Sequence, residues 1–312
     1  MGKYFGRSAP CKYSQPPEPP QSPEPSTSGS YFIVPCSCPL VILLRHLTFC
    51  KIIPIFALGN TTDYSTSLAM RYFIYLQYDG AAYCGWQRQP DTPTVQGVIE
   101  QRLSMLCRMP IEIVGAGRTD TGVNASFYVA HFDIDSPIAD CAQLVYKLNK
   151  VLPDDIAILR IEEVEASKHA RFDAKQREYT YRLTTRKAPF ARFSSWYFAV
   201  ELDVERMNRA AERLLAYDDF TSFAKLNSNN KTNICHITHA RWEVEADGTL
   251  RFTIRADRFL RNMVRAIVGT LVDVGRGRYS VEQFDEIIRS RDLSRSSAGA
   301  PACGLFLSDV KY

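Results

Sequence analysis

The chain has 312 residues, of which 46% are apolar and 23% are charged, and its formal net charge is +4. These values are ordinary for a globular protein of one or two domains. They exclude a strongly polybasic chain, so any nucleic-acid site must be a local basic surface.

Residues 1–69 differ in composition from the rest. The tract from Pro16 to Pro25 is of low complexity and cannot build a core. The apolar run from Tyr31 to Leu44 contains prolines and is too short for a membrane span, which needs roughly 18 or more apolar residues. It also lies too far from Met1 for a standard signal peptide. We expect a disordered leader, and we hypothesise that Met70 is the natural start.

The nine cysteines include no Cys-x-x-Cys pair, and five of them are scattered after Met70. Scattered cysteines fit reduced thiols in a cytoplasmic protein better than a disulfide framework. Their spacing does not indicate a zinc site.

The first half of the folded part reads as strand, helix, two strands, helix and strand. Apolar and β-branched patterns predict strands at 72–78, 111–114, 127–134 and 156–161 and helices at 95–107 and 139–150. Thr92 followed by Pro93 resembles an N-cap with proline at the first helical position. This order predicts a ferredoxin-like unit, an antiparallel sheet with helices on one face, over residues 70–166.

The second half, residues 167–312, roughly mirrors this order. Strands are predicted at 177–184, 237–245, 250–256 and 305–310, and helices at 203–214, 259–274 and 281–289. Asp203 is a good N-cap. We therefore predict an α+β fold in which two ferredoxin-like halves lie side by side and form an extended, mainly antiparallel sheet.

A glycine-rich segment from Val114 to Ala125 joins two of the predicted strands and carries Arg118 and Asp120. Glycine permits close approach of a ligand to the backbone, and functional side chains often lie on such loops. The same residues also fit an ordinary surface turn with an ion pair. A Gly-x-Gly that precedes a strand is a poor nucleotide-binding signal. On the residues alone, the surface turn is the stronger alternative.

The run from Gly117 to Val123 resembles the catalytic signature of the tRNA pseudouridine synthase A family. Other segments resemble the same family in the same order, so that the resemblance extends from about Met70 to Tyr312. These segments are residues 78–80, 83–89, 169–172, 177–181, 219–223, 259–265 and 304–307. Asn124 stands where the family usually carries His, and we expect a supporting role that Asn partly fills.

The resemblance implies an isomerase that converts uridine to pseudouridine in the anticodon stem-loop of tRNA, at positions 38–40 in tRNA numbering. Asp120 would be the catalytic carboxylate, with Arg265 as its partner. Tyr179 would stack on the extruded base, which is worth about 1–3 kcal/mol. Because no atom or electron is gained or lost, the reaction needs no cofactor and no metal. The family also implies a basic cleft that is completed by homodimerisation.

Five further arginines are candidate substrate-binding residues. Family position implies that Arg118 helps to extrude the base or fills the space it leaves, with phosphate contact as the alternative. The remaining candidates could equally be solvated surface charges: Arg88, Arg171, Arg177 and Arg261. The predicted 259–274 helix could likewise be amphipathic with a solvated basic edge, and only the family match favours Arg265 as a catalytic residue.

Three alternatives remain beside this hypothesis. The chain could be a catalytically inactive tRNA-binding protein on the same fold, or a pseudouridine synthase that acts on another RNA. A glycosidase or phosphohydrolase is a weaker alternative, because no second placed carboxylate or metal cluster is evident.

Overall fold

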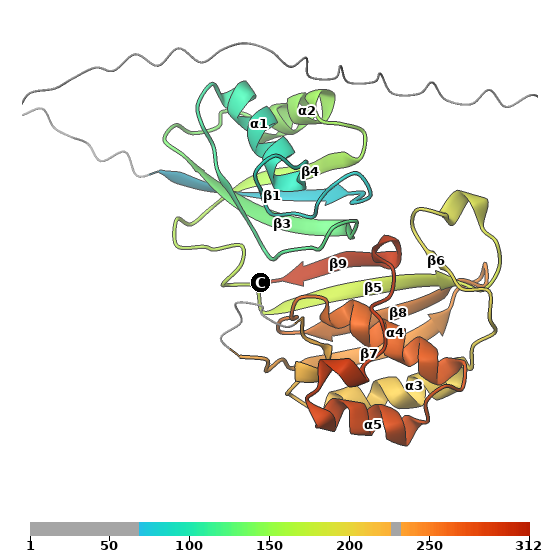
Figure 1. Ribbon diagram of the computed structural model, residues 1–312. Coiled ribbons are helices and arrows are strands. Elements are labelled where there is room, and N and C mark those ends of the chain that lie inside the picture. The colour runs from blue at the N-terminus through green and yellow to red at the C-terminus, as the bar shows by residue number, and fades with distance from the viewer. Residues whose placement is uncertain (1–68, 226–231) are drawn as a thin grey trace, which may run out of the picture. The chain divides into compact units, whose positions relative to one another are not determined.

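The computed structural model describes residues 69–225 and 232–312, and within these ranges the strands form one mixed sheet (Figure 1). The expectations for residues 1–68 lie outside the described part. The strands are β1 (Met70–Tyr78), β2 (Ile113–Gly115), β3 (Asn124–Ile134), β4 (Ile156–Val164), β5 (Gln176–Thr184), β6 (Trp196–Tyr197), β7 (Ile237–Val244), β8 (Leu250–Ala256) and β9 (Leu305–Lys311). The α-helices are α1 (Val95–Cys107), α2 (Cys141–Val151), α3 (Val204–Arg213), α4 (Met263–Gly275) and α5 (Val281–Ser290).

The strand order along the sheet is β4-β1-β3-β9-β5-β8-β7, with β2 paired to β3 and β6 paired to β5. Most neighbours are antiparallel. The exception at the centre is the parallel pairing of β3 with β9, in which Asn124 lies opposite Phe306. This junction joins a half built from β1–β4 to a half built from β5–β9. The α+β class predicted from the sequence is therefore confirmed.

The first half owes its core to aromatic and aliphatic side chains of β1 and β3 that pack with α1. Tyr72 stacks on Phe132 with ring centroids 5.7 Å apart, and Ile99 of α1 is fully buried. The predicted N-cap of this helix was wrong by two residues. The Thr94 hydroxyl, and not Thr92, accepts a hydrogen bond from the Gly97 amide at 3.3 Å, which leaves Pro93 before the helix.

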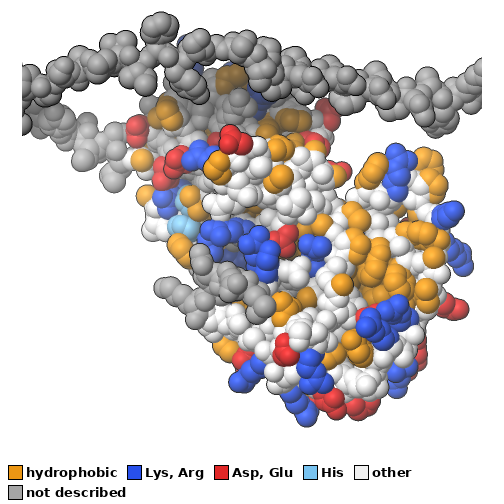
Figure 2. All heavy atoms as spheres, in the orientation of Figure 1, with side chains coloured by type: hydrophobic (Ala, Val, Ile, Leu, Met, Phe, Trp, Pro, Cys, Tyr) orange, Lys and Arg blue, Asp and Glu red, His pale blue; other side chains and the backbone are white. Residues whose placement is uncertain are grey.

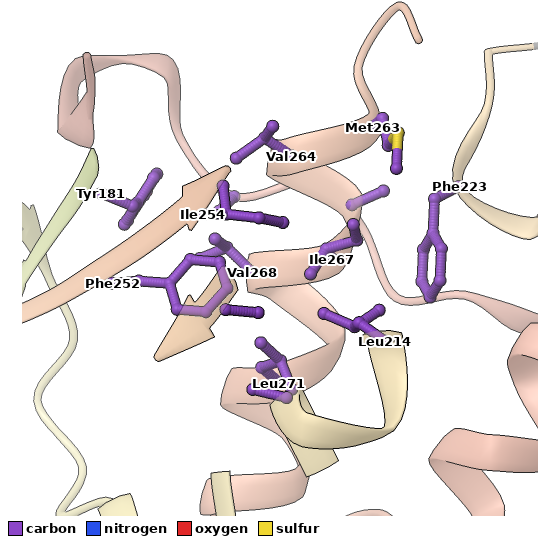
Figure 3. Close-up of a cluster of buried hydrophobic side chains, with 14 of the residues drawn as sticks. Tyr181, Leu214, Phe223, Phe252, Ile254, Met263, Val264, Ile267, Val268 and Leu271 are labelled. Carbon is purple, nitrogen blue, oxygen red and sulfur yellow. The ribbon is translucent and has the colours of Figure 1, made fainter. Parts of the chain in front are cut away.

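The second half is centred on α4, whose residues are almost all buried (Figure 3). Met263, Ile267 and Leu271 recur every four residues and are fully buried. Full burial of such a side chain stabilises a fold by about 1.5–3 kcal/mol. The predicted start of this helix at Phe259 was wrong. Asn262 has φ 65°, which is left-handed and ends the preceding turn, so the helix begins at Met263.

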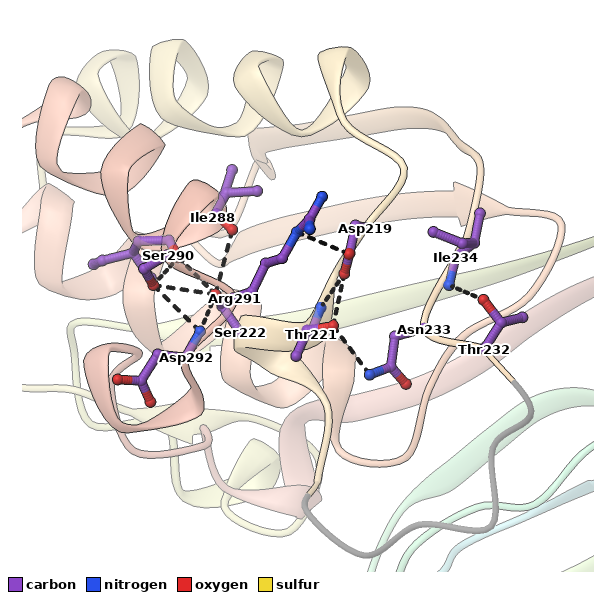
Figure 4. Close-up of polar contacts among 11 residues, drawn as sticks. Asp219, Thr221, Ser222, Thr232, Asn233, Ile234, Ile288, Ser290, Arg291 and Asp292 are labelled. Atoms are coloured by element: carbon purple, nitrogen blue, oxygen red, sulfur yellow. Dashed lines mark hydrogen bonds and ion pairs between the residues drawn. The ribbon is translucent and has the colours of Figure 1, made fainter.

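A polar network fixes the segment between α3 and β7 to the end of α5 (Figure 4). The Ser222 hydroxyl donates to the Ile287 carbonyl at 2.6 Å and accepts from the Asp292 amide at 3.1 Å. The guanidinium of Arg291 binds Asp219 at 2.9 Å. The segment 219–223 therefore has a structural role, because it anchors the end of α5.

Other local predictions are confirmed. Asp203 caps α3 by accepting from the Arg206 amide at 2.8 Å, and Met207 of this helix is fully buried. The hairpin β7–β8 turns at residues 245–249. The short strand β6 has no counterpart in the predictions. Among the described residues, no helix combines the length and apolar character that a membrane crossing requires.

Candidate active site

The glycine-rich loop between β2 and β3 packs against the segment that follows β1, and backbone hydrogen bonds join the two. The Trp86 amide donates to the Thr119 carbonyl at 3.4 Å, and the Gly122 amide donates to the Tyr83 carbonyl at 3.3 Å. Gly85 has φ 86°, and a Cβ there would lie 2.4 Å from the Thr119 oxygen. Only glycine lets the two backbones approach this closely, so this packing determines the position of the loop.

Aromatic rings fix the base of the same loop. Trp86 and Tyr128 stack with centroids 4.0 Å apart, and both are buried. A Cβ on Gly115 would lie 2.1 Å from the Tyr128 hydroxyl oxygen. The Tyr78 hydroxyl and the Thr119 hydroxyl are hydrogen-bonded at 2.9 Å. The loop is thus a rigid support for Asp120 and not a free surface turn.

The carboxylate of Asp120 faces two guanidinium groups from the other half of the fold. Its Oδ1 lies 3.6 Å from Nε of Arg261, and its Oδ2 lies 4.0 Å from Nη1 of Arg265. The Asp120 side chain is 26% exposed, so the carboxylate can be reached from solvent. Arginine keeps its charge in such partly desolvated surroundings, so both guanidinium groups face the carboxylate as cations.

Arg265 is oriented by the backbone of a segment near the C-terminus. Its Nε donates to the Ala300 carbonyl at 2.6 Å, and the Ala300 amide donates back to the Arg265 carbonyl at 2.9 Å. A Cβ on Gly299 would lie 3.1 Å from Oδ1 of Asn262, the residue before α4, so there is little room for a side chain at this position. The sequence predicted Arg265 near Asp120, but the Ala300 carbonyl carries no sequence signal.

Tyr179 lies in β5, opposite Leu307 of β9, and contacts the cores of both halves. Its ring meets Phe259 edge-on with centroids 5.1 Å apart. Burial, and secondarily the negative charge of Asp120, raise the pKa of Tyr179 to about 12. The phenol is therefore protonated at neutral pH and can donate a proton or a hydrogen bond, whereas its phenolate is not available as a base.

The structure divides the predicted arginines into two groups. Arg118, Arg171 and Arg261 expose their side chains near or beside the Asp120 loop. Lys and Arg side chains gather between the two halves in Figure 2, with an acidic side chain among them. Arg261 was predicted to bind substrate, and its pairing with Asp120 is an additional contact that spacing did not reveal.

Arg88 and Arg177 are engaged within the protein instead. Arg88 pairs with Glu100 at 3.2 Å and Glu112 at 3.6 Å. The Arg177 guanidinium donates to four backbone carbonyls at 2.7–3.1 Å, and desolvation lowers its pKa. These four carbonyls belong to Ala116, Arg171, Ala174 and Asp257. Since these donors are occupied, Arg177 holds the two halves together, and a phosphate contact is better suited to the exposed arginines.

Asn124 is buried at the junction of the halves. Its Oδ1 accepts from the Gly80 amide at 2.8 Å, and its Nδ2 donates to the Cys303 carbonyl at 2.9 Å. Asn124 thereby ties the end of the Asp120 loop to the turn after β1 and to the segment before β9. No group of three metal-ligating side chains occurs within residues 69–225 and 232–312.

Comparison with known proteins matches the same residues to one family. A family model described as tRNA pseudouridine synthase matches residues 74–173 and 210–312. A tRNA pseudouridine synthase A of Bacteroides thetaiotaomicron is 52% identical over 244 residues, which are 78% of this chain and 90% of that protein. Its namesake in Porphyromonas gingivalis is 52% identical over 78% of this chain and 97% of that protein. The Acetivibrio thermocellus protein of that name is 40% identical over 77% and 98%, respectively.

Among solved structures, a 3-hydroxy-3-methylglutaryl-coenzyme A reductase of Streptococcus pneumoniae aligns with a TM-score of 0.17 at 10% identity, over 73% of this chain and 68% of that one. This likeness is too weak to bear on fold or function.

Proposed function

Because this chain belongs to the tRNA pseudouridine synthase family, we propose that it isomerises uridine to pseudouridine in tRNA, with Asp120 as the catalytic carboxylate. The observation that carries the proposal is the pairing of Asp120 with Arg261 and Arg265 across the junction of the halves. A carboxylate that is paired with guanidinium groups and yet open to a ligand is suited to this reaction.

The reaction breaks the bond between C1′ and N1, turns the base, and forms a bond between C1′ and C5. The C5 proton leaves and N1 gains a proton, so that atoms and charge balance. A carboxylate can promote this by covalent addition, either at C1′ or at C6. Both routes need a carboxylate that a ligand can reach, and the Asp120 side chain is 26% exposed.

Tyr179 and Arg118 complete the proposed site. A base within folded RNA must leave its stack to reach a pocket, and Tyr179, near Asp120, could hold that base by stacking. Its protonated hydroxyl is suited to donate a hydrogen bond to the base. Arg118 is exposed two residues from Asp120 and has no partner among the described residues. It is therefore free to fill the space that the base leaves or to bind a phosphate.

Exposed arginines are the proposed contacts to the RNA backbone. Arg171 and Arg261 have exposed side chains, and such contacts make binding sensitive to salt. By family likeness we further propose the anticodon stem-loop as the target, a homodimer as the working form, and the cytoplasm as the location.

We also infer that each half, residues 70–166 and 167–312, is a ferredoxin-like unit. The strand orders β4-β1-β3-β2 and β9-β5-β8-β7 support this, since each half follows the same sequence of pairings. The catalytic carboxylate would then belong to one unit and its guanidinium partners to the other.

The direct test incubates unmodified tRNA with the wild-type protein and with Asp120→Ala and maps pseudouridine in the product. We expect pseudouridine in the anticodon stem-loop with wild type and none with the variant. RNA affinity should be retained in Asp120→Ala, since the carboxylate adds no attraction for a polyanion. Product from both proteins would remove Asp120 from its role. No product from either, with binding intact, would favour an RNA-binding protein without catalysis, and product on another RNA alone would reassign the substrate.

A further inference from the structure

A groove of about 210 Å³ runs along α4, outside the site described above. We call it the α4 groove. Its walls are α4 on one side and the segment 297–301 on the other, and the rings of Trp196 and Phe198 line it. Two arginines that follow α4, Arg276 and Arg278, complete the lining. Figure 2 shows an apolar patch next to basic side chains on the right of this face.

The arginines of the groove carry more positive charge than their partner neutralises. Arg276 lies 2.7 Å and Arg278 lies 3.2 Å from the same carboxylate, that of Asp273. Asp273 also accepts a hydrogen bond from the Ser297 hydroxyl at 2.5 Å. One carboxylate therefore holds two guanidinium groups in place, and a net charge of about +1 remains at the mouth of the groove. Both arginines are well exposed, Arg278 at 58%.

The apolar part of the groove lining includes two aromatic rings, those of Trp196 and Phe198. Trp196 meets Phe198 edge-on at 5.0 Å and Tyr181 edge-on at 6.3 Å. Neither Trp196 nor Phe198 is fully buried. A positive rim beside aromatic rings is the combination that binds a nucleic-acid strand without reading its sequence, because guanidinium groups bind phosphate and rings stack on bases.

The groove is continuous with the proposed active site through one backbone segment. Ala300 lines the groove, and its carbonyl oxygen binds Nε of Arg265, the partner of Asp120. Arg265 and Arg276 lie in the same helix or directly after it, eleven residues apart, which corresponds to roughly 16 Å along the axis. A strand whose target base is at Asp120 can therefore continue beside α4 over a few nucleotides.

We propose that the α4 groove is a second RNA-binding subsite, in which Arg276 and Arg278 bind a backbone phosphate and Trp196 stacks on a base that flanks the target. This inference rests on the proposed function, because it takes RNA as the ligand. The segment 297–301 then contacts both subsites, since it forms a wall of the groove and orients Arg265.

The first experiment measures the affinity of the full chain for an unmodified tRNA transcript over a range of salt concentrations. Arg278→Gln is compared with Arg289→Gln, which removes the same charge from another exposed arginine paired with one aspartate, Asp285. We expect Arg278→Gln to raise Kd by roughly 3- to 10-fold at low salt and to reduce the slope of log K against log salt by about 0.7–0.9, the value for one phosphate contact. Arg289→Gln should leave both unchanged.

The second experiment needs no change of charge and uses tryptophan fluorescence. The chain has three tryptophans, of which Trp86 and Trp242 are at most 2% exposed and Trp196 lines the groove. Binding of the transcript should quench the emission and protect it from iodide. Trp196→Phe should lose the protection from iodide, because Trp86 and Trp242 are buried, and should still bind RNA, since Phe can stack in its place.

Two results would overturn the proposal: equal Kd and salt slope in Arg278→Gln and Arg289→Gln, or an RNA-induced protection from iodide that survives in Trp196→Phe. A change in subunit association in Arg278→Gln, with RNA affinity unchanged, would also overturn it and would make the groove an interface between copies. Pseudouridine formation by wild type is scored separately. If wild type forms pseudouridine and any of these results is obtained, the RNA subsite in the α4 groove is rejected and the proposed function is retained. If RNA binds in the groove but no pseudouridine forms, the subsite is retained and the proposed function is rejected.

Discussion

Gly85 and Thr119 are in backbone contact, although they come from opposite sides of α1 in the chain. A Cβ on Gly85 would lie 2.4 Å from the Thr119 carbonyl oxygen and 3.2 Å from the carbonyl carbon of Asp120. The proposed catalytic residue is thus positioned by a glycine 35 residues before it, through a contact that no side chain can replace.

Gly85→Ala should therefore displace the Asp120 loop and lower kcat by about tenfold or more, besides the roughly 1–3 kcal/mol that a strained backbone position costs. Single-turnover assays and thermal unfolding check this. Gly248→Ala is the matched control, because Gly248 has φ 82° but open space around it. If both variants lose stability and activity in parallel, backbone strain and not the contact with Thr119 is responsible.

The two guanidinium groups at Asp120 should differ in importance. Arg265 is 24% exposed and oriented by the Ala300 carbonyl, whereas Arg261 is 60% exposed. We expect Arg265→Gln to lower kcat by roughly 10²–10³-fold, the scale for loss of one preorganised electrostatic group. Arg261→Gln should cost less, since water screens exposed pairs. Rates at saturating tRNA measure this, and equal losses in the two variants would contradict the ranking.

Asn124→Ala should impair both stability and catalysis. It leaves the Gly80 amide and the Cys303 carbonyl without their side-chain partners, which costs about 1–3 kcal/mol for each buried group left unsatisfied. Denaturant unfolding and kcat, measured well below the transition, test the two effects separately.

Asn149→Ala is the control for this prediction. The Asn149 side chain also makes two backbone hydrogen bonds, both to Ile158, at 2.7 and 2.8 Å. The Asn149→Ala variant should lose a similar free energy of unfolding to Asn124→Ala without a fall in kcat. A normal kcat in Asn124→Ala would show that Asn124 supports the fold alone and leaves the Asp120 loop in position.

Stability should fall between pH 6.5 and 4 because of His131. Burial, and then the charge of Arg71 and the neighbouring His169, lower the pKa of His131 from 6.5 to about 4. Over this range the unfolded chain binds a proton at His131 that the folded chain does not bind, so acid favours unfolding. Protonation also removes the lone pair of Nδ1 that accepts from the Ala170 amide at 3.1 Å.

Urea midpoints at pH 7 and pH 4.5 measure this dependence. His131→Gln should reduce the difference between the two midpoints, whereas His236→Gln should not, since His236 is 71% exposed. An unchanged difference in His131→Gln would assign the acid sensitivity to other groups.

Periodicity in the sequence was sufficient to locate most elements, because alternation and four-residue spacing follow directly from burial of one face. Met207 and Leu271 are examples, because each lies in a predicted helix and is fully buried. Helix starts were less predictable. Thr92 and Phe259 were wrong boundaries, since the cap at Thr94 and the left-handed Asn262 depend on how the preceding turn packs.

The sequence by itself determined the type of fold and, through the family signature, the identity of Asp120, Tyr179 and Arg265 as candidates. Only the tertiary structure decided which charges meet. It brought Arg261 to Asp120, committed Arg177 to backbone carbonyls, and assigned the orientation of Arg265 to Ala300. The reason is physical: local patterns record which residues are buried, whereas the partners of a charge depend on chain segments that approach only when the two halves of the sheet join.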